Sequence, residues 1–150
     1  MKSPSSCALC IAGRIGCEAR RAAASVWRVR EGEWVRFVIL FEILDVDRFR
    51  EMARAMVAVG RDEPGTVVYD WYVDEEAGRG TLYEAYASAE ALRAHGSGVV
   101  FTELAPRYAD ALRVAKVDVF GAADGLPRRD VLGAPTVWWG APVAAVTDAR

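Results

Sequence analysis

Residues 63–101 decide the fold and read EPGTVVYDWYVDEEAGRGTLYEAYASAEALRAHGSGVVF. The stretch begins with the turn dipeptide Pro64-Gly65, and residues 66–73 are rich in the β-branched and aromatic side chains typical of a strand. The acidic, glycine-containing residues 74–80 predict a hairpin loop, and residues 81–86 predict the returning strand. A β-hairpin is therefore expected in the middle of the chain.

A short helix is expected directly after this hairpin. Ser88 can cap its N-terminus through the side-chain oxygen, and Gly96 is a typical helix end. His95, the only histidine of the chain, lies at the C-terminal end of this helix.

The segment before the hairpin predicts one strand and one helix. Residues 34–44, WVRFVILFEIL, form a strand in which both faces are largely apolar. Asp45 or Asp47 then caps a helix that runs to about Val59 and stops at Gly60. Its apolar residues follow helical spacing and are Phe49, Met52, Ala53, Met56 and Val57.

The two apolar faces of the first strand have a consequence for assembly. Both faces must be covered, because large hydrophobic side chains are normally buried. Helices can cover only one face of a sheet in a chain of 150 residues. We therefore expect a homodimer, in which the sheet face of one copy covers that of the other.

The segment after the short helix predicts another helix and another strand. The helix begins at Ser97 or Gly98, and Pro106 should kink or divide it. Its expected buried residues are Val100, Phe101, Leu104, Ala105, Tyr108 and Leu112. Residues 114–120 alternate as a fourth strand.

The C-terminal tail predicts little regular structure. Residues 125–132 suggest a helical turn, and residues 136–140, TVWWG, lie between prolines and suggest a short edge strand. Trp138 and Trp139 are too apolar to remain in water. We expect them to pack on the partner subunit or over the mouth of a pocket.

This order of elements predicts an α+β fold. It is the ferredoxin-like split βαβ arrangement with an antiparallel sheet. We expect three parts: a flexible N-terminal extension over residues 1–33, the ferredoxin-like domain over residues 34–121, and a C-terminal extension with the edge strand over residues 122–150.

The composition excludes several classes of function. The net charge of −2 gives no electrostatic basis for binding nucleic acid or a membrane surface. No apolar run approaches the roughly 20 residues that a transmembrane helix needs. No phosphate-binding loop, dinucleotide-binding glycine motif or Ser-His-Asp order is present. We expect a cytoplasmic protein.

The N-terminal extension holds all three cysteines, Cys7, Cys10 and Cys17. Cys7 and Cys10 have the spacing of half a zinc site or of a redox pair. Further ligands are missing nearby, so free thiols in a reducing compartment are the preferred interpretation. A signal peptide is the less favoured alternative, since Arg14 interrupts a short apolar stretch.

Several of these features together resemble the antibiotic biosynthesis monooxygenase family. The family comprises small dimeric α+β barrels that include quinol and anthrone oxygenases. The resemblance covers residues 34–121 and is carried by Glu63-Pro64-Gly65, Tyr69-Asp70-Trp71-Tyr72, Tyr83-Glu84-Ala85-Tyr86, Ala91-Leu92 with His95, and Phe101. It implies a dimeric α/β barrel with a pocket between the sheet and the helices. Tyr86 stands where the family most commonly has tryptophan.

His95 and Glu84 are the candidate catalytic residues. Histidine is the side chain whose ordinary pKa lies nearest neutrality, so His95 can transfer a proton. The alternative is that it caps backbone carbonyl groups at the helix end. Glu84 lies in an apolar strand, where burial would raise its pKa and make it a base. The alternative is a salt bridge to Arg36 or Lys116.

Aromatic side chains are the candidate substrate-binding residues. A cofactor-free oxygenase needs an apolar pocket for a flat substrate. Residues placed to form it are Tyr69, Trp71, Tyr86 and Phe101. The alternative is that these side chains serve only core packing.

The resemblance predicts a monooxygenase without cofactor or metal, acting on a small phenolic, quinol or anthrone-like molecule. Members that oxidise anthrones or degrade haem use an asparagine on the first strand, and this chain has no asparagine or glutamine. A non-catalytic domain that binds a small molecule is therefore an alternative. An isomerase or decarboxylase of a small keto compound is another.

Overall fold

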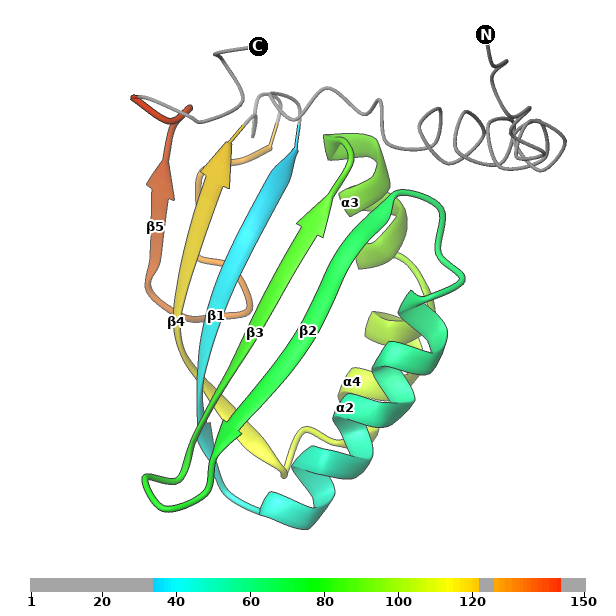
Figure 1. The fold of residues 1–150 in the computed structure, drawn as a ribbon, viewed down its shortest axis with the longest axis vertical. Helices are drawn as coiled ribbons and strands as arrows, with labels where there is room; N and C mark the ends of the chain where they lie inside the picture. The colour runs from blue at the N-terminus through cyan, green and yellow to red at the C-terminus, as the bar shows by residue number, and fades with distance from the viewer. Residues whose placement is uncertain (1–33, 122–125, 144–150) are drawn as a thin grey trace, which may run out of the picture. The chain divides into compact units, whose positions relative to one another are not determined.

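The computed structural model describes residues 34–121 and 126–143. The N-terminal extension with its three cysteines lies outside the described residues. The elements are β1 (Val35–Ile43), α2 (Val46–Gly60), β2 (Thr66–Asp74), β3 (Arg79–Tyr86), α3 (Ala89–Gly96), the π-helical turn η2 (Val100–Leu104), α4 (Ala105–Arg107), β4 (Leu112–Gly121) and β5 (Thr136–Trp139). Figure 1 shows their arrangement.

The strands form one sheet of five strands in the order β2-β3-β1-β4-β5. The first four strands pair antiparallel, and β3 lies between β1 and β2, which α2 connects. The predicted α+β fold with a split βαβ arrangement is therefore confirmed. The four strands of the predicted domain pair antiparallel as predicted, and β5 from the C-terminal extension adds one parallel pair with β4. The sheet is mixed and, within one chain, open.

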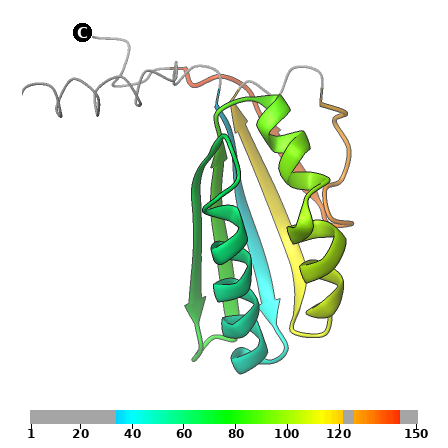
Figure 2. The same cartoon turned by 90° about the vertical axis from the view of Figure 1, so that its right-hand side faces the viewer.

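The helices cover one face of the sheet, and the core lies between that face and the helices (Figure 2). Alternate residues of β1 point into it and are no more than 5% exposed: Val35, Phe37, Ile39 and Phe41. Asp45 caps α2 through a hydrogen bond from the Arg48 backbone NH. The residues that α2 buries are Phe49, Met52, Met56 and Gly60.

The predicted third helix is wrong beyond Arg107. Val100, Leu104 and Tyr108 are buried as expected. The helical segment ends with the short α4, and Pro106 lies in the first turn of α4, where proline is tolerated. Leu112 lies in β4, paired with Ile43. The predicted helical turn over residues 125–132 is also wrong for its described part, since residues 126–132 contain no helix and consist of bends, irregular backbone, the isolated β-bridge of Val131 and the start of a turn.

Candidate functional site

A hydrogen-bonded pair, His95 and Glu63, lies at the end of α3. His95 is 3% exposed, and its Nδ1 lies 2.5 Å from Oε2 of Glu63. The turn between α2 and β2 brings Glu63 to this position. Gly65 in that turn has φ +86, and a Cβ there would lie 2.6 Å from the Cβ of Ala91 in α3. Only glycine therefore allows the turn to approach α3 so closely.

The alternative that His95 caps the helix is not what the structure shows. The Ser97 hydroxyl donates to the carbonyl oxygens of Arg93 and Ala94, at 3.0 and 3.1 Å. Nδ1 of the imidazole is instead hydrogen-bonded to the Glu63 carboxylate. A carboxylate partner favours the proton on Nδ1 and leaves the lone pair on Nε2.

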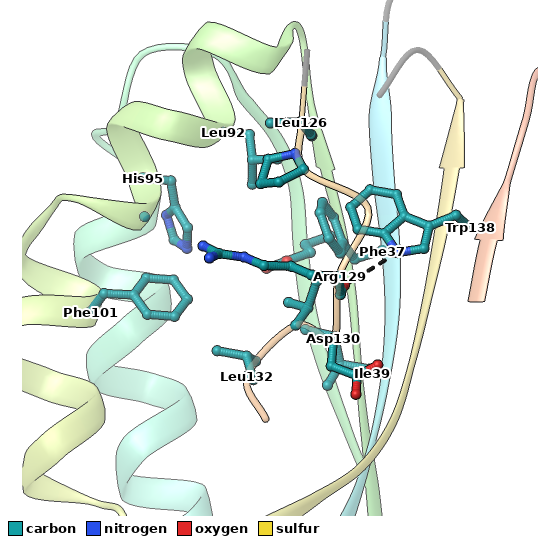
Figure 3. A pocket seen from close by; sticks show the side chains of 14 residues that line it. Phe37, Ile39, Leu92, His95, Phe101, Leu126, Arg129, Asp130, Leu132 and Trp138 are labelled. Atoms are coloured by element: carbon teal, nitrogen blue, oxygen red, sulfur yellow. Dashed lines mark hydrogen bonds between the residues drawn. The ribbon is translucent and has the colours of Figure 1, made fainter. Parts of the chain in front are cut away.

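Three aromatic rings hold the His95 imidazole in place. The ring centroids of Tyr86, Tyr69 and Phe101 lie 5.1, 5.2 and 5.4 Å from that of His95. Within the described part of the chain, Nε2 of His95 has no hydrogen-bond partner, and the side chain lines a cavity (Figure 3). The ring is therefore fixed, and its second nitrogen is available to a bound molecule.

Glu84 is a buried carboxyl group on β3, 5% exposed. Burial raises its pKa to about 7, and the nearby Glu63 adds to the rise, while a hydrogen bond from Tyr86 opposes it. That bond runs from the Tyr86 hydroxyl to Oε2 at 2.9 Å. The alternative of a salt bridge to Arg36 or Lys116 is wrong. Lys116 pairs with Asp118, and Arg36 lies over the Trp34 ring.

The raised pKa of Glu84 predicts a pH-dependent stability. Between about pH 4.5 and 7 the folded chain keeps a proton that the unfolded chain releases, so the stability falls as the pH rises through this window. The loss is on the order of 3 kcal/mol. Glu84→Gln should lack this loss, which urea unfolding at pH 5, 6, 7 and 8 would measure. Glu103→Gln, at an exposed position, is the control and should keep the wild-type pH dependence. The prediction would be contradicted if the free energy of unfolding of Glu84→Gln changed with pH as much as that of wild type.

A cavity of about 450 Å³ lies between α3, the sheet and the segment 126–138. Its lining is mostly apolar and includes Phe37, Ile39, Leu92, Phe101, Leu126 and Trp138. His95 and Glu84 are among its polar residues. This volume suits a small-molecule ligand, and the few polar groups suit its orientation.

A second cavity of about 130 Å³ adjoins the first on the side of α2. Ile39, Glu84, Phe101 and Leu132 line both. The predicted substrate-binding residues therefore do not all line the same cavity. Phe101 contacts both cavities, and Tyr69 and Trp71 contact the smaller one. Tyr86 lines neither and instead packs on His95 and bonds to Glu84.

Sequence reasoning missed several residues of this site. From the sequence, Glu63 is recognisable only as part of the turn motif, and nothing local marks it as the partner of His95. Arg129, Leu132 and Trp138 line the larger cavity from the tail. Trp138 agrees with the expectation of packing over a pocket mouth, whereas Trp139 stacks on Phe120 with centroids 6.1 Å apart.

The fold and site define a ferredoxin-like α+β domain with a mostly apolar pocket next to a histidine–carboxylate pair whose imidazole is buried. Residues 45–107 match the family model described as antibiotic biosynthesis monooxygenase. The resemblance found in the sequence is thereby confirmed over these residues. A search of curated proteins found no match.

Solved structures with the same fold include proteins from bacteria and an archaeon. MupZ from Pseudomonas fluorescens is 21% identical, with a TM-score of 0.53 over 59% of this chain and 72% of its own. SnoaB from Streptomyces nogalater, titled a cofactor-independent oxygenase, is 17% identical, with a TM-score of 0.53 over 64% and 99%. A conserved protein from Methanosarcina mazei is 18% identical, with a TM-score of 0.54 over 60% and 93%. These similarities show the fold.

Within the described ranges, no helix is long and apolar enough to cross a membrane. Over the same ranges, no three His, Cys, Asp or Glu side chains are grouped as a metal site.

Proposed function

We propose that this protein is a cofactor-independent monooxygenase that acts on a small phenolic, quinol or anthrone-like molecule. The observation that carries the proposal is the Glu63–His95 pair, whose imidazole borders a mostly apolar cavity of about 450 Å³. The family match and the fold shared with SnoaB, an oxygenase by its title, support it. The cytoplasm remains the expected compartment.

The geometry suggests how the residues would act. A substrate against Phe37 and Phe101 would present its acidic C–H or O–H to Nε2 of His95, which accepts the proton. Glu63 stabilises the imidazolium that results. The substrate carbanion or phenolate then gives an electron to O2. For an anthrone, the CH2 group becomes a carbonyl group, and the second oxygen atom leaves as water with both hydrogens. Thus no other reductant is consumed.

Burial excludes two neighbouring tyrosines as the base. It strongly raises the pKa of Tyr69 and Tyr86, so both remain phenols at neutral pH. Glu84, with a pKa of about 7, can hold or release a proton near neutrality and would orient the substrate or share in proton transfer.

Oxygen uptake tests the proposal directly. The purified protein, treated to remove metal and flavin, would be mixed with a panel of quinols and anthrones, and dissolved O2 and product would be followed together. We expect one O2 consumed for each quinone formed from an anthrone. Binding of these compounds with no uptake above the rate without protein would contradict an oxygenase.

A second candidate function is a non-catalytic binding domain for an aromatic molecule. The observation that favours it lies on β1, where the cavity-lining residues Phe37 and Ile39 carry no polar group. The family's anthrone oxygenases have an asparagine on this strand. This candidate predicts tight binding without oxygen consumption, which the same panel distinguishes.

A further inference from the structure

The segment 126–138, here called the strap, is built against the cavity by hydrogen bonds. Val131 bridges Ala134, which is 2% exposed, and the Val131 backbone NH donates to Oγ1 of Thr136 at 2.8 Å. Nε1 of Trp138 donates to the carbonyl oxygen of Arg129 at 3.3 Å. The C-terminal end of the strap belongs to β5, which pairs with β4. Side chains of the strap are therefore held in position over the cavity.

Arg129 projects from the strap into the cavity. Figure 3 shows its side chain extending toward His95, with Phe101 beyond it. No ion pair or side-chain hydrogen bond of its guanidinium is found in the described part of the chain. The neighbouring Arg128 is also exposed but does not line the cavity. Arg129 is exposed overall, lines a mostly apolar pocket and has no partner among the described residues, so its guanidinium can accept an anionic group of a ligand.

The carboxyl groups near the cavity have hydrogen-bond partners other than the Arg129 guanidinium. Asp130 also lines the cavity, but Figure 3 shows it directed away from His95, and its Oδ1 accepts a hydrogen bond from the Thr136 backbone NH at 3.3 Å. Glu84 bonds to Tyr86. Glu63 is occupied by His95.

We propose that Arg129 is an anion-binding residue of this cavity, and that its ligand is an aromatic molecule carrying a carboxylate. The guanidinium group can bind a carboxylate through two parallel hydrogen bonds, while the apolar walls hold the rings. This inference deepens the proposed function, because it rests on the cavity being the substrate site. It does not depend on oxygen chemistry.

The experiment compares two probes of the same shape, naphthalene-2-carboxylate and naphthalene-2-carboxamide, by isothermal titration calorimetry on the full chain. We expect wild type to prefer the carboxylate by about 10-fold to 100-fold, the usual range for a hydrogen bond to a charged group. Arg129→Gln should lose this preference and bind the carboxamide as wild type does. Arg128→Gln, which removes the same charge one position away, should keep the preference.

Equal carboxylate binding by Arg129→Gln and wild type would overturn the proposal. So would an equal loss in Arg128→Gln, which would indicate a general effect of surface charge, or the absence of any carboxylate preference in wild type up to millimolar probe. Because binding needs no O2, these results are independent of oxygen uptake. A carboxylate preference without uptake would reject the oxygenase and retain the anion site.

Discussion

Replacing His95 with alanine is expected to lower kcat/KM for oxygen uptake by about 10²-fold to 10⁴-fold, the usual contribution of a general acid or base. The variant removes the only imidazole of the chain and leaves Glu63 without its partner. Neither Tyr69 nor Tyr86 can take over, because burial strongly raises the pKa of both. Rates under air, measured over a range of substrate concentrations, would give kcat and KM separately.

Glu63→Gln separates a chemical role of the pair from a structural one. Glutamine keeps the size of the side chain but removes the charge that stabilises the imidazolium, so we expect an intermediate loss of kcat, about 10-fold to 100-fold. Substrate affinity should change little, since Glu63 does not line the larger cavity. The free energy of unfolding of each variant is the control. Unchanged kcat in His95→Ala would remove His95 from the mechanism.

The hairpin and the helix after it could be predicted from the sequence because their signals are local. Strand alternation and the Pro64-Gly65 turn placed β2, and Ser88 with Gly96 placed α3. The third helix could not be predicted in full. The spacing of four residues that joins Val100, Leu104 and Tyr108 continues to Leu112, although Leu112 begins a strand. An apolar residue in that register fits both structures.

The site was only partly predictable because its central contacts join distant parts of the chain. His95 stands out in the sequence as the only histidine, at the end of a helix, and Glu84 stands out as a carboxyl group in an apolar strand. The partner of His95 lies 32 positions earlier, and nothing local marks that pairing. Arg129 lies in a tail whose path over the cavity depends on parallel pairing of β5 with β4. Parallel pairing leaves no hairpin signal in the sequence.

The far face of the sheet supports the proposed homodimer. It carries apolar side chains that the helices do not cover: Val38, Leu40, Tyr72, Tyr83, Phe120 and Trp139. Leu40 is 41% exposed on β1, the central strand of the sheet, and Tyr72 is 55% exposed. Asp70, Lys116 and Asp118 lie among them on the same face, with Lys116 and Asp118 paired at 2.8 Å. Large apolar side chains left exposed on one face of a sheet mark a candidate interaction site. A second copy presenting the same face is the occupant we propose.

Leu40→Arg is expected to dissociate this dimer. An arginine at the centre of an apolar interface would be buried without a partner, which costs several kcal/mol and weakens association by at least about 100-fold. Sedimentation equilibrium at micromolar concentration should give twice the mass of one chain for wild type and a single chain for Leu40→Arg.

Leu44→Arg is the matched control for this experiment, since Leu44 is 51% exposed but lies beyond the end of β1. It should remain dimeric. A monomeric wild type, or dissociation by both variants alike, would contradict an interface on the sheet face. The exposed side chains of that face would then need another cover, because the cavity and the His95 pair are built on the opposite face and do not contact them.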